Sequence, residues 1–167
     1  MTPIPAAHLL LGLLLTAFLS MGMAGAATPD NVRSEAWMAE HYTKHEHRIP
    51  MRDGVRLFTR VYVPKDSSTR WPILLTRTPY ALKPYGPDAY SKFSGSLGTF
   101  AEDRFILVTQ DVRGRYASEG TFEHVRPFRP GKTGTQTDES SDAWDTIDWL
   151  VKNVPGNNGR VGMTGMS

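Results

Sequence analysis

The sequence predicts an α/β fold with a mostly parallel sheet that opens with an antiparallel hairpin. Two segments of alternating character flank Asp53-Gly54, a dipeptide typical of tight hairpin turns. Short apolar runs follow at 73–75 and 105–108, and such runs are typical of strands that are buried on both faces of a sheet. Helical patterns separate the later strands, and an alternation of strands and helices favours a parallel sheet.

The N-terminus has the pattern of a secretory signal peptide, residues 1–26. An apolar stretch at 9–19 is followed by small residues at 24–27, which resemble a signal-peptidase site. We expect cleavage after Ala26, which makes the protein periplasmic or secreted and leaves it without membrane contact. An uncleaved anchor is the alternative, because the apolar stretch, extended to Ala27, approaches the length of a membrane span.

The folded part is expected to occupy residues 42–167. The preceding stretch, 27–41, is polar and mixed, so we expect a linker there, with about one turn of helix around Trp37. With 167 residues, 40% of them hydrophobic and 22% charged, the chain fits one globular domain or the front part of a larger one.

The composition also limits the partners. The formal net charge is +2 and the basic residues are scattered, so nothing indicates a nucleic-acid surface. Cysteine is absent, which excludes disulfides and thiolate metal sites. Gly131-Lys132-Thr133 lacks the upstream glycine of a phosphate-binding loop, because Arg126 stands there. We expect no nucleotide, metal or organic cofactor, and the oligomeric state stays open.

The first elements form a hairpin and a central strand. Residues 44–51 and 55–63 alternate as hairpin strands do, and Asp53 and Gly54 have structural roles in the turn between them. The apolar run at 73–75 then predicts a strand inside the sheet.

The later elements alternate between helix and strand. A helix is expected at 97–103, a strand at 105–108, a long loop at 111–137, a helix at 138–153 and a strand at 160–165. A loop of this length in a compact domain is usually functional or disordered.

Three histidines lie close together at the start of the hairpin. His45 and His47 share one face of the first strand, with His41 nearby. This spacing allows a metal site. We favour the other interpretation, an exposed edge strand.

This order of elements is that of the first half of an α/β-hydrolase fold, which ends at the nucleophile elbow. Gly165-Met166-Ser167 matches the start of a G-x-S-x-G elbow, in which a serine sits between a strand and a helix. The acid and the histidine of such a serine follow it in this fold. All five histidines of this sequence precede Ser167, so we expect both triad partners to be encoded downstream.

Four segments in one order resemble a known family. They are IPMRDGV at 49–55, LLTRTPY at 74–80, QDVRG at 110–114 with SEG at 118–120, and GRVGMTGMS at 159–167. The sequence resembles the hydrolases that group X-Pro dipeptidyl-peptidases, α-amino acid ester hydrolases, cocaine esterase and glutaryl-cephalosporanate acylases. The resemblance implies a longer protein, with the rest of the hydrolase domain, a helical cap and a C-terminal jelly-roll.

The resemblance also implies roles for two residues. Ser167 matches the nucleophile that forms an acyl-enzyme, although a serine at a helix start also fits the local pattern. Tyr80 matches the tyrosine whose phenol helps to form the oxyanion hole, and the alternative is a tyrosine that packs behind Pro79.

The long loop begins with two charged residues at the carboxyl end of a strand. Arg113 could bind a substrate carboxylate there, but we favour an internal Asp111–Arg113 pair that shapes the loop. The helix that follows the loop carries acidic residues in its first half, and helix capping and solubility are the favoured roles for them. These residues are Asp138, Glu139, Asp142 and Asp145.

The sequence therefore predicts an exported serine hydrolase that acts on ester or amide bonds of a small molecule or peptide. The substrate stays open among X-Pro peptides, amino acid esters and glutaryl amides. The alternative is a catalytically inactive fragment, or a secreted binding remnant that lacks the acid and the histidine of the triad.

Overall fold

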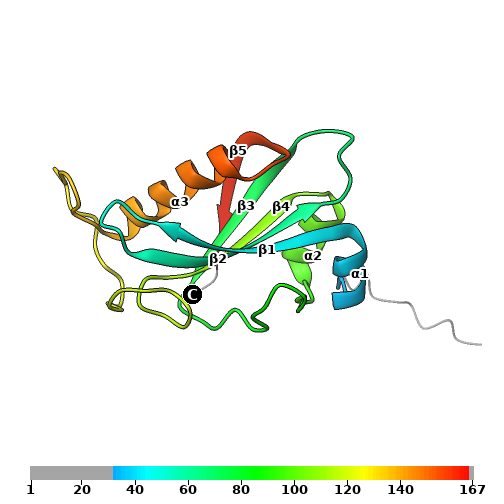
Figure 1. Cartoon of the computed structure of the whole chain (residues 1–167), viewed down its shortest axis with the longest axis horizontal. Helices are drawn as coiled ribbons and strands as arrows, with labels where there is room; N and C mark the ends of the chain where they lie inside the picture. Colours follow the sequence, from blue (N-terminus) through cyan, green and yellow to red (C-terminus); the bar gives the residue numbers. More distant parts are fainter. Residues whose placement is uncertain (1–31, 166–167) are drawn as a thin grey trace, which may run out of the picture.

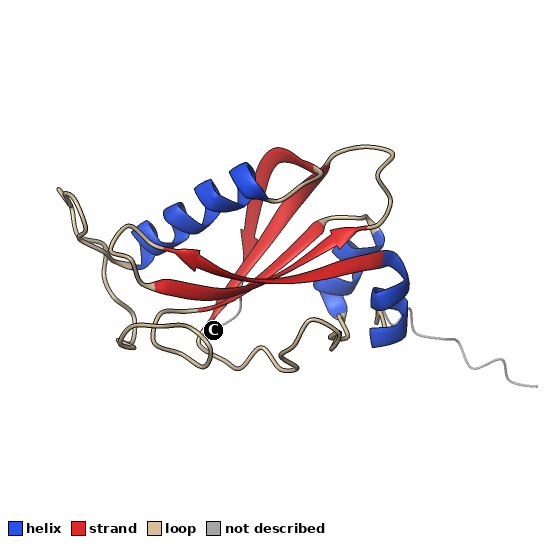
Figure 2. Ribbon diagram, viewed as in Figure 1, coloured by secondary structure: helices blue, strands red, loops and turns tan. Residues whose placement is uncertain are grey.

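The computed structural model describes residues 32–165 and shows helices on both faces of a twisted sheet (Figures 1 and 2). The predicted signal peptide, 1–26, and Ser167 lie outside the described residues. The elements are α1 (Glu35–His41), β1 (Tyr42–Pro50), β2 (Arg56–Pro64), β3 (Trp71–Thr78), α2 (Gly95–Glu102), β4 (Ile106–Asp111), α3 (Glu139–Asn153) and β5 (Asn157–Thr164). Within this part of the chain, no helix is long and apolar enough to cross a membrane.

The sheet has five described strands in the order β1-β2-β4-β3-β5. The β1–β2 and β2–β4 pairs are antiparallel, whereas β3 pairs in parallel with both β4 and β5. The prediction of a parallel sheet that opens with an antiparallel hairpin is therefore confirmed. The predicted strand at 73–75 lies inside β3, and the predicted strand at 105–108 overlaps the first half of β4.

Each face of the sheet has its own apolar core, because successive strand residues point to opposite sides. On one face Ile73, Leu75 and Val108 pack with Leu150 of α3. On the other, Leu74, Leu107 and Tyr62 pack with Met38 of α1 and Ala101 of α2. The two helical layers lie above and below the sheet in Figure 2.

The hairpin turn follows the prediction. Gly54 has a φ of +86°, a conformation that favours glycine, and the Asp53 carboxylate accepts a hydrogen bond from the Val55 amide at 3.2 Å. β1 forms one edge of the sheet, and His45 is exposed on it, 6.0 Å from the ring of His47. His45 thus fits the edge-strand interpretation, whereas His47 is half-buried beside Trp149 and His41 ends α1.

The predicted linker differs from the structure in its second half. Residues 35–41 form a seven-residue helix that is longer than the single turn expected. Ser34 accepts a hydrogen bond from the Trp37 amide, and Met38 is fully buried against the sheet. Tertiary packing stabilises this helix, and a segment this short carries little periodic signal in the sequence.

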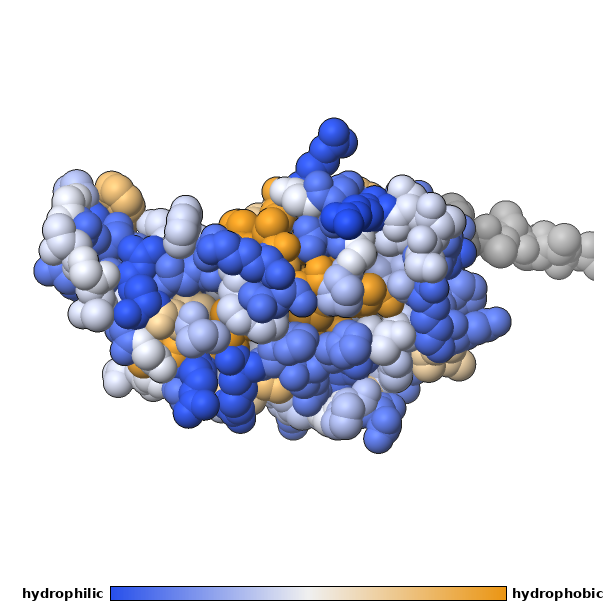
Figure 3. Space-filling model, turned by 45° about the horizontal axis from the view of Figure 1, so that its top comes forward, coloured by the Kyte–Doolittle hydropathy of each residue, from blue (hydrophilic) through white to orange (hydrophobic). Residues whose placement is uncertain are grey.

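β5 forms the other edge of the described sheet and is mostly exposed. Met163 on this strand exposes 52% of its surface. Figure 3 turns the side with α3 and β5 toward the viewer, and apolar surface appears there between hydrophilic regions.

Candidate active site

A cavity of about 620 Å³ lies at the carboxyl ends of the parallel strands β3 and β5. Open α/β sheets bind ligands at this edge. Thr78 and Tyr80 contribute to its wall from the end of β3, and Thr164 and Gly165 contribute from the end of β5. The two segments meet because Thr76 of β3 is in register with Thr164 of β5.

Tyr80 lies at this cavity, with 57% of its surface exposed. Its amide donates a hydrogen bond to Thr78 Oγ1 at 3.1 Å. The Thr78 carbonyl accepts from the Val112 amide at 3.1 Å, and the Pro79 carbonyl accepts from Arg115 Nε at 3.0 Å. The backbone that carries Tyr80 is therefore held by the loop that follows β4.

Ser167 is two residues beyond Gly165, the last described residue. Its role as the nucleophile stays a prediction. Gly165 lines the same cavity as Tyr80, so the described end of the elbow segment and the predicted oxyanion residue share one site.

Asp111 is fully buried at the end of β4 and holds the following loop. Its Oδ2 accepts hydrogen bonds from Tyr85 Oη at 3.1 Å and from the Ala117 amide at 3.2 Å, and its carbonyl accepts from Ser118 Oγ at 2.6 Å. Burial raises the pKa of Asp111 above its ordinary value, and these hydrogen bonds reduce the increase. The contacts agree with the structural role predicted for Asp111.

Arg113 is paired internally, but its partner is not Asp111. The guanidinium bonds both oxygens of Asp142, at 3.0 and 2.7 Å, and Oδ2 of Asp53 at 2.7 Å. β4 ends at Asp111 and the chain turns at 113–114, so the two residues do not share one face of a strand. The internal pairing was expected and the partner was not. The substrate-binding role weighed for Arg113 disagrees with these contacts, because two carboxylates already occupy its donors.

Burial and ion pairing have opposite effects on the pKa of Arg113. Burial would lower its pKa, but the hydrogen bonds and charges of Asp142 and Asp53 raise the pKa above its ordinary value. The guanidinium therefore stays charged and links the β1–β2 turn to α3.

The acidic residues of α3 do more than cap the helix. Asp138 is the N-cap and forms a capping box with Ser141, as expected. Glu139 pairs with Arg77 at 3.1 Å and with Arg126 at 3.0 Å. Arg77 lies three residues before Tyr80, so this ion-pair network ties the end of β3 to the start of α3.

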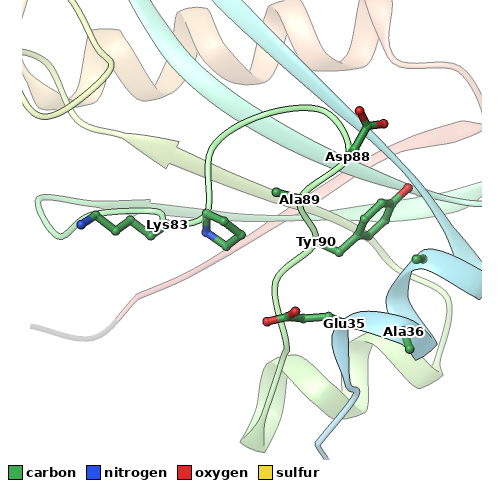
Figure 4. A pocket seen from close by; sticks show the side chains of 8 residues that line it. Glu35, Ala36, Lys83, Asp88, Ala89 and Tyr90 are labelled. Carbon is green, nitrogen blue, oxygen red and sulfur yellow. The ribbon is translucent and has the colours of Figure 1, made fainter.

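A second cavity, of about 630 Å³, lies between α1 and the loop at 83–90 (Figure 4). Glu35 and Asp88 line it, together with Lys83 and Tyr90. None of the residues in Figure 4 comes from the end of β5, and we therefore place the candidate site at the cavity beside Tyr80.

Sequence reasoning missed several of the described residues of the cavity wall, and the only buried arginine among them is Arg60. Arg60 of β2 is only 3% exposed and lines the cavity with Thr109 of β4. A charged residue inside the alternating stretch 55–63 was the available signal.

Comparisons with known proteins identify relatives of this chain. The model of the X-Pro dipeptidyl-peptidase family, S15, matches residues 53–167. Cocaine esterase from Rhodococcus sp. (strain MB1 Bresler) is 38% identical over 120 residues, which are 71% of this chain and 18% of that protein. A structure of an α-amino acid ester hydrolase is 46% identical with a TM-score of 0.62, and the match covers 74% of this chain and 21% of that one. An aminopeptidase from the marine sediment archaeon Thaumarchaeota archaeon is 43% identical with a TM-score of 0.63, over 76% and 22% of the two chains.

The chain thus spans about a fifth of the length of these relatives. A CocE/NonD family hydrolase from Staphylococcus aureus, 17% identical with a TM-score of 0.53, covers 74% of this chain and supports the fold alone. The expected fold, the N-terminal part of an α/β-hydrolase, is confirmed. On the family match and the two close structures, the chain belongs to the X-Pro dipeptidyl-peptidase (S15) family of hydrolases.

Proposed function

We propose that this chain is the N-terminal part of an exported serine hydrolase that cleaves ester or amide bonds through an acyl-enzyme on Ser167. One observation carries the proposal. Tyr80, at the end of β3, and Gly165, two residues before Ser167, line one cavity at the carboxyl edge of the parallel sheet. A nucleophile and an oxyanion donor must meet a substrate carbonyl at one such place.

In the first half of the reaction, Ser167 Oγ attacks the carbonyl carbon and gives its proton to a general base. The carbonyl oxygen becomes an oxyanion, and the Tyr80 phenol donates a hydrogen bond to it. The intermediate collapses, the bond to the leaving alcohol or amine breaks, and the leaving group takes the proton from the base. An acyl ester on Ser167 remains.

In the second half, water replaces the leaving group. The base removes a proton from water, the hydroxide attacks the acyl carbon, and Tyr80 stabilises the second oxyanion. The ester bond to Ser167 then breaks, and Oγ recovers its proton. The products are a carboxylic acid and the free enzyme.

The general base and its orienting acid come from a further part of the polypeptide in this proposal. Among the described residues that line the cavity, none is a histidine, an aspartate or a glutamate. In the α/β-hydrolase order, the acid and the histidine follow the serine.

The names of the relatives suggest the bonds to test. They include a cocaine esterase, an α-amino acid ester hydrolase and an aminopeptidase. Esters, amino acid esters and peptide amides are therefore the proposed substrate range. Export is proposed from the pattern of residues 1–26.

The test is hydrolysis by the complete protein that contains this chain, purified from the periplasm or medium. Wild type should release p-nitrophenol from p-nitrophenyl acyl esters or p-nitroaniline from amino acid and X-Pro anilides. Ser167→Ala should reduce kcat by at least about 10⁴-fold, because the acyl-enzyme can no longer form.

The control is Ser96→Ala, which removes an exposed hydroxyl at the same cavity and should keep most of the activity. Equal activity of wild type and Ser167→Ala would contradict the proposal. A wild-type protein inactive on every ester and amide would favour the alternative of a binding protein.

A further inference from the structure

Arg60 is a buried cation whose hydrogen bonds to described residues all go to neutral acceptors. It is 3% exposed, and its Nε donates to Thr109 Oγ1 at 3.2 Å. Its Nη1 donates to the Pro84 carbonyl at 3.1 Å and to Ser91 Oγ at 2.9 Å. These acceptors are all neutral. Within residues 32–165, Arg60 forms no salt bridge, in contrast to Arg77, Arg113 and Arg126.

This arrangement is unusual, because a buried guanidinium is normally paired with an anion. Burial raises the pKa of Asp111, and the charge of Arg60 opposes this increase with a smaller effect. The Asp111 carboxylate accepts its hydrogen bonds from Tyr85 and the Ala117 amide instead. The positive charge of Arg60 is therefore only partly balanced within the described chain.

The cavity that Arg60 lines is positive. Its lining includes two exposed lysines, Lys83 and Lys92, as well as Arg77, whose charge is balanced by Glu139 of α3. Among its described lining residues none carries a carboxylate. The hydrogen bonds that Arg60 makes to described residues use Nε and Nη1, which leaves the Nη2 donors for a ligand. A guanidinium with a free edge binds carboxylates well, since its planar donors match their geometry.

The start of α2 adds to the positive potential of the cavity. The N-cap, Ser94, makes no side-chain capping hydrogen bond, and Ser94, Ser96 and Leu97 line the same cavity as Arg60. The first amides of a helix lack partners inside the helix, and they carry partial positive charge. An anion in the cavity would meet these amides as well as the guanidinium.

We propose that the cavity beside Tyr80 binds a carboxylate group of the substrate, with Arg60 as its anchor. The inference rests on the proposed hydrolase function and narrows its substrates to esters or amides with an anionic group on the acyl or the leaving side. The substrate carboxylate supplies the negative counter-charge that Arg60 lacks within the described chain. Arg60 acts here as a specificity residue, since the bond-breaking steps belong to Ser167 and Tyr80.

The test compares matched neutral and anionic substrates in the complete protein. Mono-p-nitrophenyl glutarate is compared with p-nitrophenyl butyrate for the acyl side, and 3-acetoxybenzoate with phenyl acetate for the leaving side. In one pair at least, kcat/KM should favour the anionic ester by tenfold or more. Arg60→Met should reduce that ratio at least tenfold. Arg56→Met, on the same strand but outside the cavity wall, should leave the ratio unchanged.

Binding gives a readout that is independent of catalysis. Glutarate or benzoate, titrated calorimetrically into wild type, should bind, and Arg60→Met should abolish that binding. Should Arg60→Met fail to fold, Lys92→Met, an exposed residue at the same cavity, should lower the kcat/KM ratio about threefold.

Two outcomes separate the two proposals. Hydrolysis of the neutral esters without preference for anionic ones, and without carboxylate binding, would overturn the role of Arg60 and leave the hydrolase proposal intact. Carboxylate binding that requires Arg60, without hydrolysis of any ester, would support the anion site and contradict the proposed function.

Discussion

Asp142 is the most informative residue for the stability of this domain, and we predict that Asp142→Asn is strongly destabilising. The side chain is fully buried and accepts hydrogen bonds from two guanidinium groups, with Arg113 Nη2 at 2.7 Å and Arg126 Nη2 at 2.5 Å. The substitution keeps the volume but removes the charge. It also places an amide N–H against groups that can only donate hydrogen bonds.

The expected cost follows from what remains. Removing one partner of a buried ion pair costs roughly 3–5 kcal/mol, because the other charge stays buried. Arg113 keeps Asp53, and Arg126 keeps Glu139. Asp53 and Glu139 are both partly exposed, so we expect a cost at the lower end of this range, about 3 kcal/mol.

Urea unfolding of the complete protein, followed by tryptophan fluorescence, measures this change, since Trp144 and Trp149 lie on the same helix as Asp142. The matched control is Asp148→Asn on the same helix. Asp148 forms an exposed pair with Lys152 at 2.7 Å, and its loss should cost at most about 0.5 kcal/mol. A cost for Asp142→Asn as small as that of the control would refute the reasoning.

Three further predictions follow from the loops and the site. Gly114→Ala should destabilise the domain far more than Gly131→Ala, measured as the thermal unfolding midpoint. Both residues have a φ near +70°, but a Cβ at Gly114 would lie 2.0 Å from the Phe122 amide nitrogen, whereas Gly131 faces open space; equal shifts would contradict this. Asp138→Ala should cost about 1 kcal/mol at pH 7 through loss of the N-cap. Burial opposes ionisation of Asp138, but hydrogen bonds from Lys132, the Arg129 amide and the Ser141 amide lower its pKa below the ordinary value. The stabilisation by Asp138 is therefore present above the ordinary carboxyl pKa of about 4 and is lost at lower pH. The free energies of unfolding of wild type and variant, measured by urea titration, should thus converge in acid. A difference between them that grows in acid would contradict this reasoning. Tyr80→Phe should lower kcat about 10²–10³-fold with little change in KM in steady-state assays; an effect on KM alone would assign Tyr80 to substrate binding.

Much of the fold could be predicted from local patterns. The hairpin follows from Asp53-Gly54 and its alternating flanks, and β3 and β4 follow from apolar runs that a sheet buries on both faces. Only one turn of the helix at 35–41 was predicted, because its full length depends on packing of Met38 against distant strands. Such packing leaves no periodic signal in seven residues.

Among the charged residues of the site, too, local features could be predicted and long-range contacts could not. The cap at Asp138 is local and could be predicted from its position before a helical pattern. The partners of Arg113 lie 60 and 29 residues away in the chain, so spacing favoured the wrong neighbour, Asp111. Arg60 stands inside a strand pattern, and only the assembled sheet and the loop at 83–94 reveal that it faces a cavity.

The central claim is that Ser167 is a nucleophile whose reactivity depends on the site around Tyr80. A fluorophosphonate probe, followed by peptide mass spectrometry of the complete protein, tests this claim most directly. We predict a single phosphonyl adduct on Ser167, formed much more slowly in Tyr80→Phe and absent from heat-denatured protein. An adduct on another residue, or no adduct on folded protein that hydrolyses esters, would contradict the account.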